Sequence, residues 1–458
     1  MKKLVALVLS VVMIAAMVTG CSSTAQQETQ APTTAAAQEV KATEAAPVET
    51  EAEVPQEETP EEIVWITLSD FVPTLEPIVA RYKELTGVNV KLEGYASQDL
   101  TEVIEVKIGT GNEDYDVISV DGPLVSSYAY RGMVAPLDEY WVADEFDQIT
   151  EVSKGAGSWQ GVFYCPPMNT SSCVLFYNKK MLEDSGVELP ADISCTNRLS
   201  FEQIADMCRQ IKGKLDPNGT NGVYGLDYRQ VSRTYQMNEL PNSMGGKNIG
   251  DDGFTAEGVI NSDEWVKACT WYQDCVNEGI SSRGINASET RNLFISDKIA
   301  FMFDTTSLPA YCEKNGMDYW GVLPAPYFEG YEDKVATPTG SWHFGVNKDS
   351  RYKKAASDFI KWMTIGEGAD RWFEDYNILP TKKTLLDRID SDPSVGLELK
   401  YAVYESANTA VARALTPGFN EYNTIIANAW EDIRNGEDVK EVLDGAAADI
   451  EKVLNKFR

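Results

Sequence analysis

The stretch that opens the folded part of the sequence alternates between two hydrophobic patterns. Apolar residues recur at helical spacing through 74–86 and 99–108, whereas 63–69, 88–92 and 115–120 have the pattern of short strands. Parallel neighbouring strands need a long crossover connection, which a helix usually supplies. The order strand–helix–strand–helix–strand therefore predicts an α/β fold in which helices cover a mostly parallel sheet.

Later segments repeat this alternation towards the C-terminus. A folded part that begins near residue 63 and runs to the end of the chain exceeds the usual size of one hydrophobic core, so we expect two lobes. Further short strands are predicted at 300–303, 320–323 and 344–346, and long helices at 352–365, 398–411, 422–435 and 438–456.

Three residues follow the carboxyl ends of predicted parallel strands, where ligands bind in such sheets. Asp70 and Phe71 follow the first strand, and Asp121 follows the third. Each carboxylate either faces a ligand or caps the next helix. Phe71 either stacks on a ligand or packs against the helix that follows it. We treat all three as candidate binding residues.

Residues 1–20 have the pattern of a secretory signal peptide. Lys2 and Lys3 give a positive start, residues 4–18 are almost entirely apolar, and small residues precede Cys21. The apolar run is shorter than the ~20 residues of a membrane span. Residues 18–21 resemble a bacterial lipobox, whose cysteine is acylated; an ordinary signal peptide with a chance cysteine is the alternative. We expect Cys21 to be lipidated, with palmitate among its acyl chains, and to anchor the chain on the extracytoplasmic face of the cell membrane.

Residues 22–62 are rich in Ala, Thr, Gln, Pro and Glu, contain no aromatic residue and have one basic residue, Lys41. A segment with low hydrophobicity and like charge cannot bury enough apolar surface to offset its chain entropy. The sequence therefore predicts that 21–62 comprises the lipidated cysteine and a disordered acidic tether.

The composition excludes several classes of function. A formal net charge of −31 argues against nucleic acid as a partner. With His343 as the single histidine, a Ser-His-Asp triad or a histidine-rich zinc site is not expected, so we predict no catalytic residues, no cofactor and no metal. Paired carboxylates still leave glycoside hydrolysis open. Seven cysteines besides Cys21 cannot all pair; we expect mostly free, buried thiols, with a Cys165–Cys173 disulfide as the alternative.

Several weak motifs, in a fixed order, cover nearly all of residues 63–458. They are DVISVD (116–121) with YAYRGMVAPLD (128–138), GVFY (161–164) with LFYNK (175–179), FISDKIAFM (294–302), TGSW (339–342) with the helix at 355–363, and ILPT (378–381). In this order they resemble the extracellular solute-binding proteins of ABC importers, specifically the maltose-binding-like group that serves sugars. Asp297 is a departure, because glycine is usual there.

The resemblance implies two α/β lobes, each a mostly parallel sheet flanked by helices, which are joined by hinge crossings and close on a ligand. It implies crossings near 167–171, 303–305 and 346–350. The N-terminal lobe would then comprise 63–168 and 304–348, and the C-terminal lobe 169–303 and 349–458.

The resemblance also adds candidate ligand contacts. Asn169 and Ser171 lie in the first crossing, Asp304 and Ser307 at the second, and Trp342 follows Gly340, so that it either stacks on a ligand or packs in the core. The remaining candidates are the polar and aromatic residues Tyr228, Arg229 and Tyr235 of one loop, for which a surface role is the alternative, and Phe419 and Tyr422 before a late helix.

Together these features predict a monomeric, non-catalytic binding lipoprotein. The resemblance implies a carbohydrate ligand, the permease subunits of an ABC importer as partners, and attachment to the membrane through the lipid anchor. A secreted enzyme that acts on polysaccharide is one alternative. A receptor for another solute, such as a peptide or a polyamine, is the other.

Overall fold

The computed structural model describes residues 59–229, 234–283 and 287–458. The predicted signal peptide, Cys21 and nearly all of the acidic tether lie outside these residues. Among the residues described, no helix has both the length and the apolar character that crossing a membrane requires. The folded part begins with a strand at Glu62, one residue before the predicted boundary.

The first sheet has the order β11-β3-β1-β2, in which β1, β2 and β3 are parallel and β11 is antiparallel to β3. The helices α1 and α2 connect its parallel strands, as the alternating sequence pattern predicts. The bounds are β1 Glu62–Leu68, α1 Val72–Thr86, β2 Asn89–Tyr95, α2 Ser97–Lys107, β3 Val117–Asp121 and β11 Trp342–Val346.

Alternate residues of β1 face two different layers, because successive side chains of a strand point to opposite faces. Ile63 and Trp65 pack on the side of α1, α13 (Lys353–Ile365) and α14 (Glu367–Tyr376), where Trp65 lies 5.6 Å from Phe359 between ring centroids. Ile66 and Leu68 pack on the side of α2 and α3 (Val125–Tyr130). The first sheet is therefore covered on both faces.

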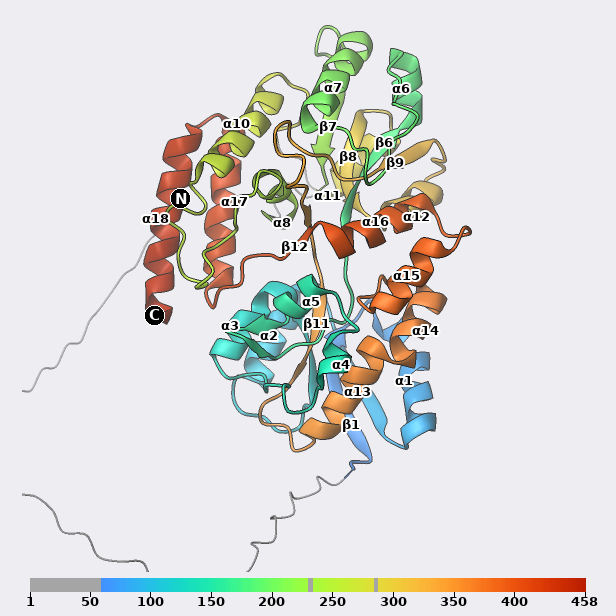
Figure 1. The fold of residues 1–458 in the computed structure, drawn as a ribbon, viewed down its shortest axis with the longest axis vertical. Helices are drawn as coiled ribbons and strands as arrows, with labels where there is room; N and C mark the ends of the chain where they lie inside the picture. Colours follow the sequence, from blue (N-terminus) through green and yellow to red (C-terminus); the bar gives the residue numbers. More distant parts are fainter. Residues whose placement is uncertain (1–58, 230–233, 284–286) are drawn as a thin grey trace, which may run out of the picture. The chain divides into compact units, whose positions relative to one another are not determined.

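The second sheet has the order β7-β8-β6-β9, with β7 parallel to β8 and β6 antiparallel to both of its neighbours. One face packs on α7 and α10, and the other on α11, α12, α15 and α16. Figure 1 shows the two sheets in separate lobes. The bounds are β6 Cys173–Asn178, α6 Lys179–Ser185, α7 Phe201–Leu215, β7 Tyr224–Tyr228, α10 Asp263–Asn277, α11 Ala287–Ile295, β8 Ile299–Thr305, α12 Leu308–Lys314, β9 Trp320–Leu323, α15 Lys383–Ser391 and α16 Leu397–Asn408.

The remaining elements are short or C-terminal. Helices α17 and α18 pack on α10 in the second lobe, where Trp265 and Trp430 lie 6.0 Å apart between ring centroids. The bounds are η1 Gly122–Leu124, α3 Val125–Tyr130, α4 Ala143–Phe146, α5 Glu151–Ala156, β4 Ser158–Trp159, β5 Val162–Phe163, α8 Thr234–Met237, α9 Glu239–Asn242, β10 Thr337–Pro338, α13 Lys353–Ile365, α14 Glu367–Tyr376, β12 Ala410–Val411, α17 Phe419–Asn435, α18 Val439–Leu454 and η2 Asn455–Phe457.

The pairing of strands corrects the predicted division into lobes. Strand β9 pairs with β6 in the second sheet, so 304–348 does not belong to the N-terminal lobe as a whole, although β11 does. Helices α13 and α14 pack on the first lobe, so 349–458 is not wholly C-terminal: Phe359 contacts Trp65, and Trp372 contacts Phe71. The sequence pattern gives the elements, but long-range pairing decides which sheet each one joins.

Three chain segments meet where the lobes are connected. Pro167 and Ser172 form bridges with His343 and Thr339, so 167–172 and 339–343 run antiparallel. The N–H of Thr170 donates to the carbonyl oxygen of Leu379 at 2.9 Å, which adds the segment after α14. The predicted crossing at 167–171 therefore agrees with the structure.

The other two predicted crossings are wrong. Phe303 and Asp304 lie within β8 of the second sheet, and the chain continues there through α12. Val346 lies within β11, and Asn347 forms a bridge with Val134 in the first lobe. The chain instead returns to the first lobe near 339–341 and leaves it again near 377–382.

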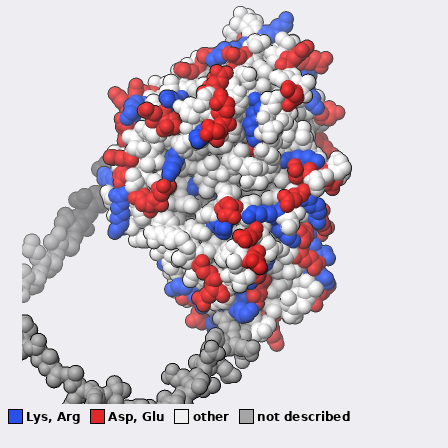
Figure 2. All heavy atoms as spheres, viewed as in Figure 1, with Lys and Arg blue, Asp and Glu red and all other residues white. Residues whose placement is uncertain are grey.

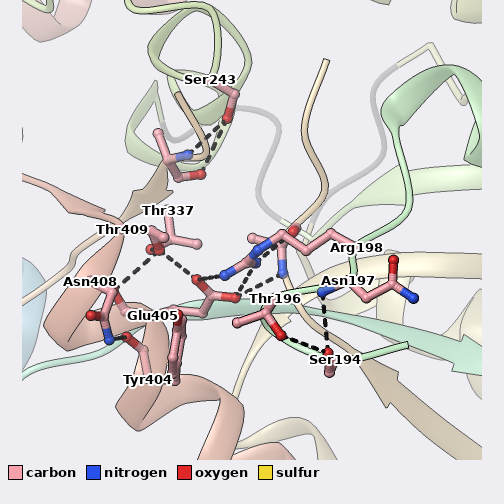
Figure 3. A network of polar contacts seen from close by, with 12 residues as sticks. Ser194, Thr196, Asn197, Arg198, Ser243, Thr337, Tyr404, Glu405, Asn408 and Thr409 are labelled. Atoms are coloured by element: carbon pink, nitrogen blue, oxygen red, sulfur yellow. Dashed lines mark hydrogen bonds and ion pairs between the residues drawn. The ribbon is translucent and has the colours of Figure 1, made fainter. Parts of the chain in front are cut away.

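A buried ion pair ties three segments of the second lobe together (Figure 3). Glu405 of α16 is fully buried and accepts two bonds from Arg198, at 2.6 and 3.1 Å. It also accepts from the backbone N–H of Ala325 at 3.0 Å and from Thr409 Oγ1 at 2.5 Å. Thr409 Oγ1 in turn lies 3.0 Å from Thr337 Oγ1 of β10. This network joins α16 to the loop before α7 and to the chain that returns to the crossings.

Candidate solute-binding cleft

A cavity of about 770 Å³ lies where the first crossing reaches the carboxyl end of β8. Hydroxyl and amide side chains share its lining with aliphatic ones, two aromatic rings contribute, and Glu398 is the one charged residue among the lining residues that the structure describes. The polar and aromatic members are Asn169, Thr170, Ser171, Thr305, Thr306, Ser307, Phe373, Tyr376, Asn377 and Ser394. Since α14 belongs to the first lobe, a molecule in this cavity contacts both lobes and the crossing.

Another cavity of about 770 Å³ lies on the second lobe, around Glu313, Trp320 and Leu397. None of the predicted binding residues lines it. The cavity at the crossings is therefore the better candidate for a solute site, because ligands of such sheets bind at strand carboxyl ends.

Three of the predicted binding residues line the cavity at the crossings, and hydrogen bonds hold each of them. Asn169 is buried, and its Oδ1 accepts from the backbone N–H of Trp342 at 3.0 Å. Ser171 Oγ donates to the carbonyl oxygen of Gly340. Ser307 Oγ accepts from Arg291 Nη2 at 2.8 Å. These bonds orient the polar wall before a solute arrives.

Next to Ser307 of the cavity lining, two arginines share one buried carboxylate. Asp304 is fully buried and accepts from Arg291 at 2.7 and 2.9 Å and from Arg229 Nη1 at 3.2 Å. Both oxygens of Asp304 are therefore engaged, which argues against Asp304 as a direct acceptor for solute hydroxyls. Arg229 keeps 22% of its side chain exposed and leaves one guanidinium in excess at this edge of the sheet.

Asp121, at the end of β3, forms an ion pair that the sequence analysis does not predict. Arg413 Nη1 donates to Asp121 Oδ2 at 3.1 Å, and Arg413 Nη2 donates to Oδ1. The Arg413 guanidinium also lies over the ring of Tyr235, 5.4 Å from its centroid. Asp121 and Tyr235 are thus brought together through Arg413, which comes from the segment between β12 and α17.

Three predicted contacts lie in the hydrophobic core, and their assignment to the ligand is corrected. Tyr228 is fully buried and stacks on Phe303, with 4.7 Å between ring centroids and an interplanar angle of 11°. Phe419 and Tyr422, on α17, are also buried, and burial raises the pKa of the Tyr422 hydroxyl. Their sequence neighbourhood is polar, but the folded helix turns these rings inward.

The remaining candidates are partly or fully accessible. Asp70 is exposed after β1. Phe71 is half-buried and packs edge-to-face on Trp372, with 5.3 Å between ring centroids, which agrees with the packing alternative. Trp342 is half-buried and packs against both neighbouring cores. Their contact with a ligand remains a prediction.

Sequence reasoning missed several residues of the site. Thr170 lies between two predicted residues, so the first crossing could have indicated it. Phe373, Tyr376 and Asn377 come from the end of α14, and Asn377 has a left-handed φ of 55°, a signal for a helix end but not for a ligand. Glu398 carries no sequence signal, because only folding brings it to the cavity.

His343 is buried and hydrogen-bonded to its neighbours. Its Nδ1 lies 2.9 Å from the carbonyl oxygen of Cys165, and its Nε2 lies 2.9 Å from Ser341 Oγ. Burial lowers the pKa of His343 to about 4, so the ring is neutral at physiological pH. The prediction of mostly free, buried thiols is confirmed, because the seven cysteines of the described part are unpaired and all except Cys195 are buried.

Charged side chains on the face shown in Figure 2 are interspersed, with acidic and basic residues on both lobes. Within the described ranges, no group of His, Cys, Asp and Glu side chains has the arrangement of a metal site. The described lining of the cavity offers hydroxyl, amide, aromatic and aliphatic groups and one carboxylate, that of Glu398.

Two α/β lobes joined by several crossings, with a polar cavity between them, define a binding protein that closes on its ligand. Residues 77–395 match the family described as bacterial extracellular solute-binding protein. The match covers more than half of the chain, and the protein belongs to this family.

Solved structures of known proteins have a fold similar to that of this chain. The cyclo/maltodextrin-binding protein solved with maltotetraose superposes with a TM-score of 0.72 at 19% identity, covering 87% of this chain and 98% of that one. A Staphylococcus aureus extracellular solute-binding protein solved with maltose has a TM-score of 0.71 at 18% identity, covering 88% and 100%. The sn-glycerol-3-phosphate-binding periplasmic protein of Agrobacterium fabrum is 24% identical over 42% of this chain and 43% of its own length, so the chain spans less than half of that relative.

Proposed function

We propose that the protein captures a sugar or oligosaccharide outside the cytoplasmic membrane and delivers it to the permease of an ABC importer. The cavity at the crossings carries this proposal, because residues of both lobes line it and because hydroxyls, amides and two aromatic rings stand in its lining beside aliphatic side chains. Hydroxyl and amide groups exchange hydrogen bonds with sugar hydroxyls, and flat rings cover the apolar faces of pyranoses. Maltotetraose and maltose are bound by two proteins of similar fold.

Capture follows from contacts with both lobes. A solute that enters an open cleft touches Ser307 of the second lobe and the first crossing. The side chain of Tyr376, which packs with the core of the first lobe, adds its contacts when the first lobe is in place. The closed arrangement therefore binds the solute better, and binding shifts the population towards it. Nothing in this sequence of events changes the solute chemically, so the protein acts as a receptor and not as an enzyme.

A phosphorylated solute is the second candidate. The Agrobacterium fabrum relative is named for sn-glycerol 3-phosphate, and Arg229 leaves a guanidinium in excess beside Asp304 and Arg291. Guanidinium groups bind phosphate through charge-assisted hydrogen bonds. Against this candidate, the one charged residue of the described cavity lining is a glutamate, Glu398.

A panel of solutes separates these candidates. The protein without residues 1–21 is melted with maltose, maltotetraose, other neutral saccharides, and sn-glycerol 3-phosphate. A ligand at 100 times its dissociation constant adds about 2.7 kcal/mol to the free energy of unfolding. Stabilisation by neutral saccharides supports the first candidate, and stabilisation by the phosphate ester supports the second. Release of new reducing ends from a bound saccharide would contradict a non-catalytic role.

Attachment to the membrane through Cys21 is part of the proposal. The signal-peptide pattern and the family's extracellular character support it. Cys21→Ala removes the attachment point of the acyl chains, so labelled palmitate should no longer be incorporated and the protein should leave the membrane fraction. Unchanged incorporation would contradict the lipid anchor.

A further inference from the structure

Segment 412–418, between β12 and α17, contacts both lobes. On the side of the first lobe, Arg413 binds Asp121, and the carbonyl oxygen of Thr416 accepts from Ser126 Oγ at 2.8 Å. On the side of the second lobe, Asn248 Nδ2 donates to the carbonyl oxygen of Ala412 at 3.0 Å. Opening the lobes at this point requires one set of these contacts to break.

We infer that the Asp121–Arg413 ion pair is a latch between the lobes and that Arg413 is a positioning residue for solute binding. Its role in binding rests on the proposed function, whereas its role as a latch rests on geometry alone. The pair is bidentate, and 16% of the Arg413 side chain and 33% of the Asp121 side chain are exposed. Bidentate pairs of this kind are stronger than single surface contacts because two charge-assisted bonds share one geometry.

Tyr235 supports the latch from the second lobe. Its ring lies 5.4 Å from the Arg413 guanidinium and packs against Gly340 of the returning crossing, where a β-carbon would lie 3.5 Å from the ring. An arginine held over a ring has fewer orientations to lose when it pairs. The guanidinium is therefore already positioned for Asp121.

The latch reaches the solute cavity through the crossing. Gly340 lies between Tyr235 and Ser171, whose Oγ donates to the Gly340 carbonyl oxygen, and Ser171 lines the cavity. The backbone N–H of Gly122, next to Asp121, donates to the carbonyl oxygen of Ser341 at 2.9 Å. Loss of the ion pair thus frees the lobes at the end of the cleft where the crossing is attached.

The effect of the ion pair on solute affinity follows from the fraction of the protein that is in the closed arrangement. If only part of the protein is in the closed arrangement, the apparent affinity for solute falls by that fraction. A latch that holds the lobes together without solute raises this fraction. Weakening it should make the ligand-free protein more open and the solute bind less tightly.

The test compares Arg413→Gln, Asp121→Asn and the double variant. The matched control is Arg209→Gln, which breaks a bidentate pair with Glu278 between α7 and α10, both in the second lobe. Nitroxide labels at Lys83 of α1 and Gln210 of α7, in a Cys195→Ser background, report the distance between the lobes without solute. We expect longer distances in the three latch variants, no change in the control, and a double variant no more open than the single ones.

Maltotetraose is then titrated into each protein, with about fivefold weaker binding expected for the latch variants. Charge reversal, Asp121→Arg with Arg413→Asp, should restore the short distances, which simple loss of stability would not do. Unchanged distances in both single variants, with melting preserved, would overturn the latch. If the distances lengthen but maltotetraose binds none of the proteins, the latch stands and the proposal of a maltodextrin-like solute fails.

Discussion

The backbone N–H of Thr170 donates to the carbonyl oxygen of Leu379 at 2.9 Å, and the hydroxyl of Thr170 lies 3.2 Å from that of Thr339. One residue thus binds two other crossing segments. Thr170 and Thr339 are both buried, so their hydroxyls depend on each other rather than on solvent. Because the first crossing also lines the cavity, the geometry of the hinge and that of the solute site share the same atoms.

Thr170→Val should reduce the free energy of unfolding by about 1–3 kcal/mol, because it leaves the buried Thr339 hydroxyl without this partner. Urea unfolding measures the effect. The double variant with Thr339→Val should be destabilised by less than the sum of the two single variants, since neither polar group is then left unpaired. Strict additivity would show that the two hydroxyls do not interact.

Tyr376→Ala should weaken saccharide binding by about 1–3 kcal/mol, the range for aromatic residues that carry binding energy, because the cavity loses a ring from the first lobe. Tyr376→Phe should keep most of the affinity. Tyr331→Ala, which removes a ring outside the cavity, is the control and should bind normally. Calorimetry on the three variants measures the effect, and equal affinities would place the solute elsewhere.

Glu405→Gln should cost about 3–5 kcal/mol of stability, because the Arg198 side chain, 7% exposed, would keep its charge without a carboxylate partner. The exposed pair Lys180–Asp184 provides the comparison, and Asp184→Asn should cost no more than about 1 kcal/mol. Denaturant unfolding gives both values. Similar small losses in the two variants would mean that the network in Figure 3 contributes little.

His343 should make the protein sensitive to acid. Burial lowers its pKa from 6.5 to about 4, so between these pH values the unfolded chain binds a proton that the folded chain does not. Stability from this group is complete above pH 6.5 and falls as the pH approaches 4, by about 3 kcal/mol in all. Asp121 and Arg413 also act on the ring, in opposite directions.

The loss of stability that His343 causes at acid pH is measured as the difference in unfolding free energy between the wild type and a variant without this histidine. Burial raises the pKa of Asp227 to about 6, which stabilises the fold as the pH falls and partly offsets His343. The unfolding free energies of the wild type and His343→Gln should therefore be compared at pH 7 and pH 4.5. The advantage of the wild type should shrink towards acid pH, and parallel curves would contradict the lowered pKa.

The sequence predicts helices and strands well where the spacing of apolar residues along a short segment decides between them. The alternation from residue 63 to Asp121 predicts the parallel strands and the helices that connect them, and Gly87, with a φ of 82°, ends α1 as a left-handed residue should. The sequence could also indicate the polar first crossing, and two residues predicted there, Asn169 and Ser171, line the cavity. Tyr228 and Tyr422 show where prediction from the sequence fails. When an aromatic residue lies in a polar stretch, the local sequence does not tell whether its ring stacks on a ligand or packs in the core.

By itself the sequence determined the α/β class, the presence of a single histidine and the absence of familiar catalytic motifs, since these depend on residue type and near spacing. Only the tertiary structure decided that β9 joins the second sheet, that α13 and α14 join the first, and that Arg413 meets Asp121. These choices depend on contacts between residues far apart in the chain, which for the ion pair are separated by 292 positions. Many alternative pairings satisfy the same local pattern, and the packing of the whole core selects among them.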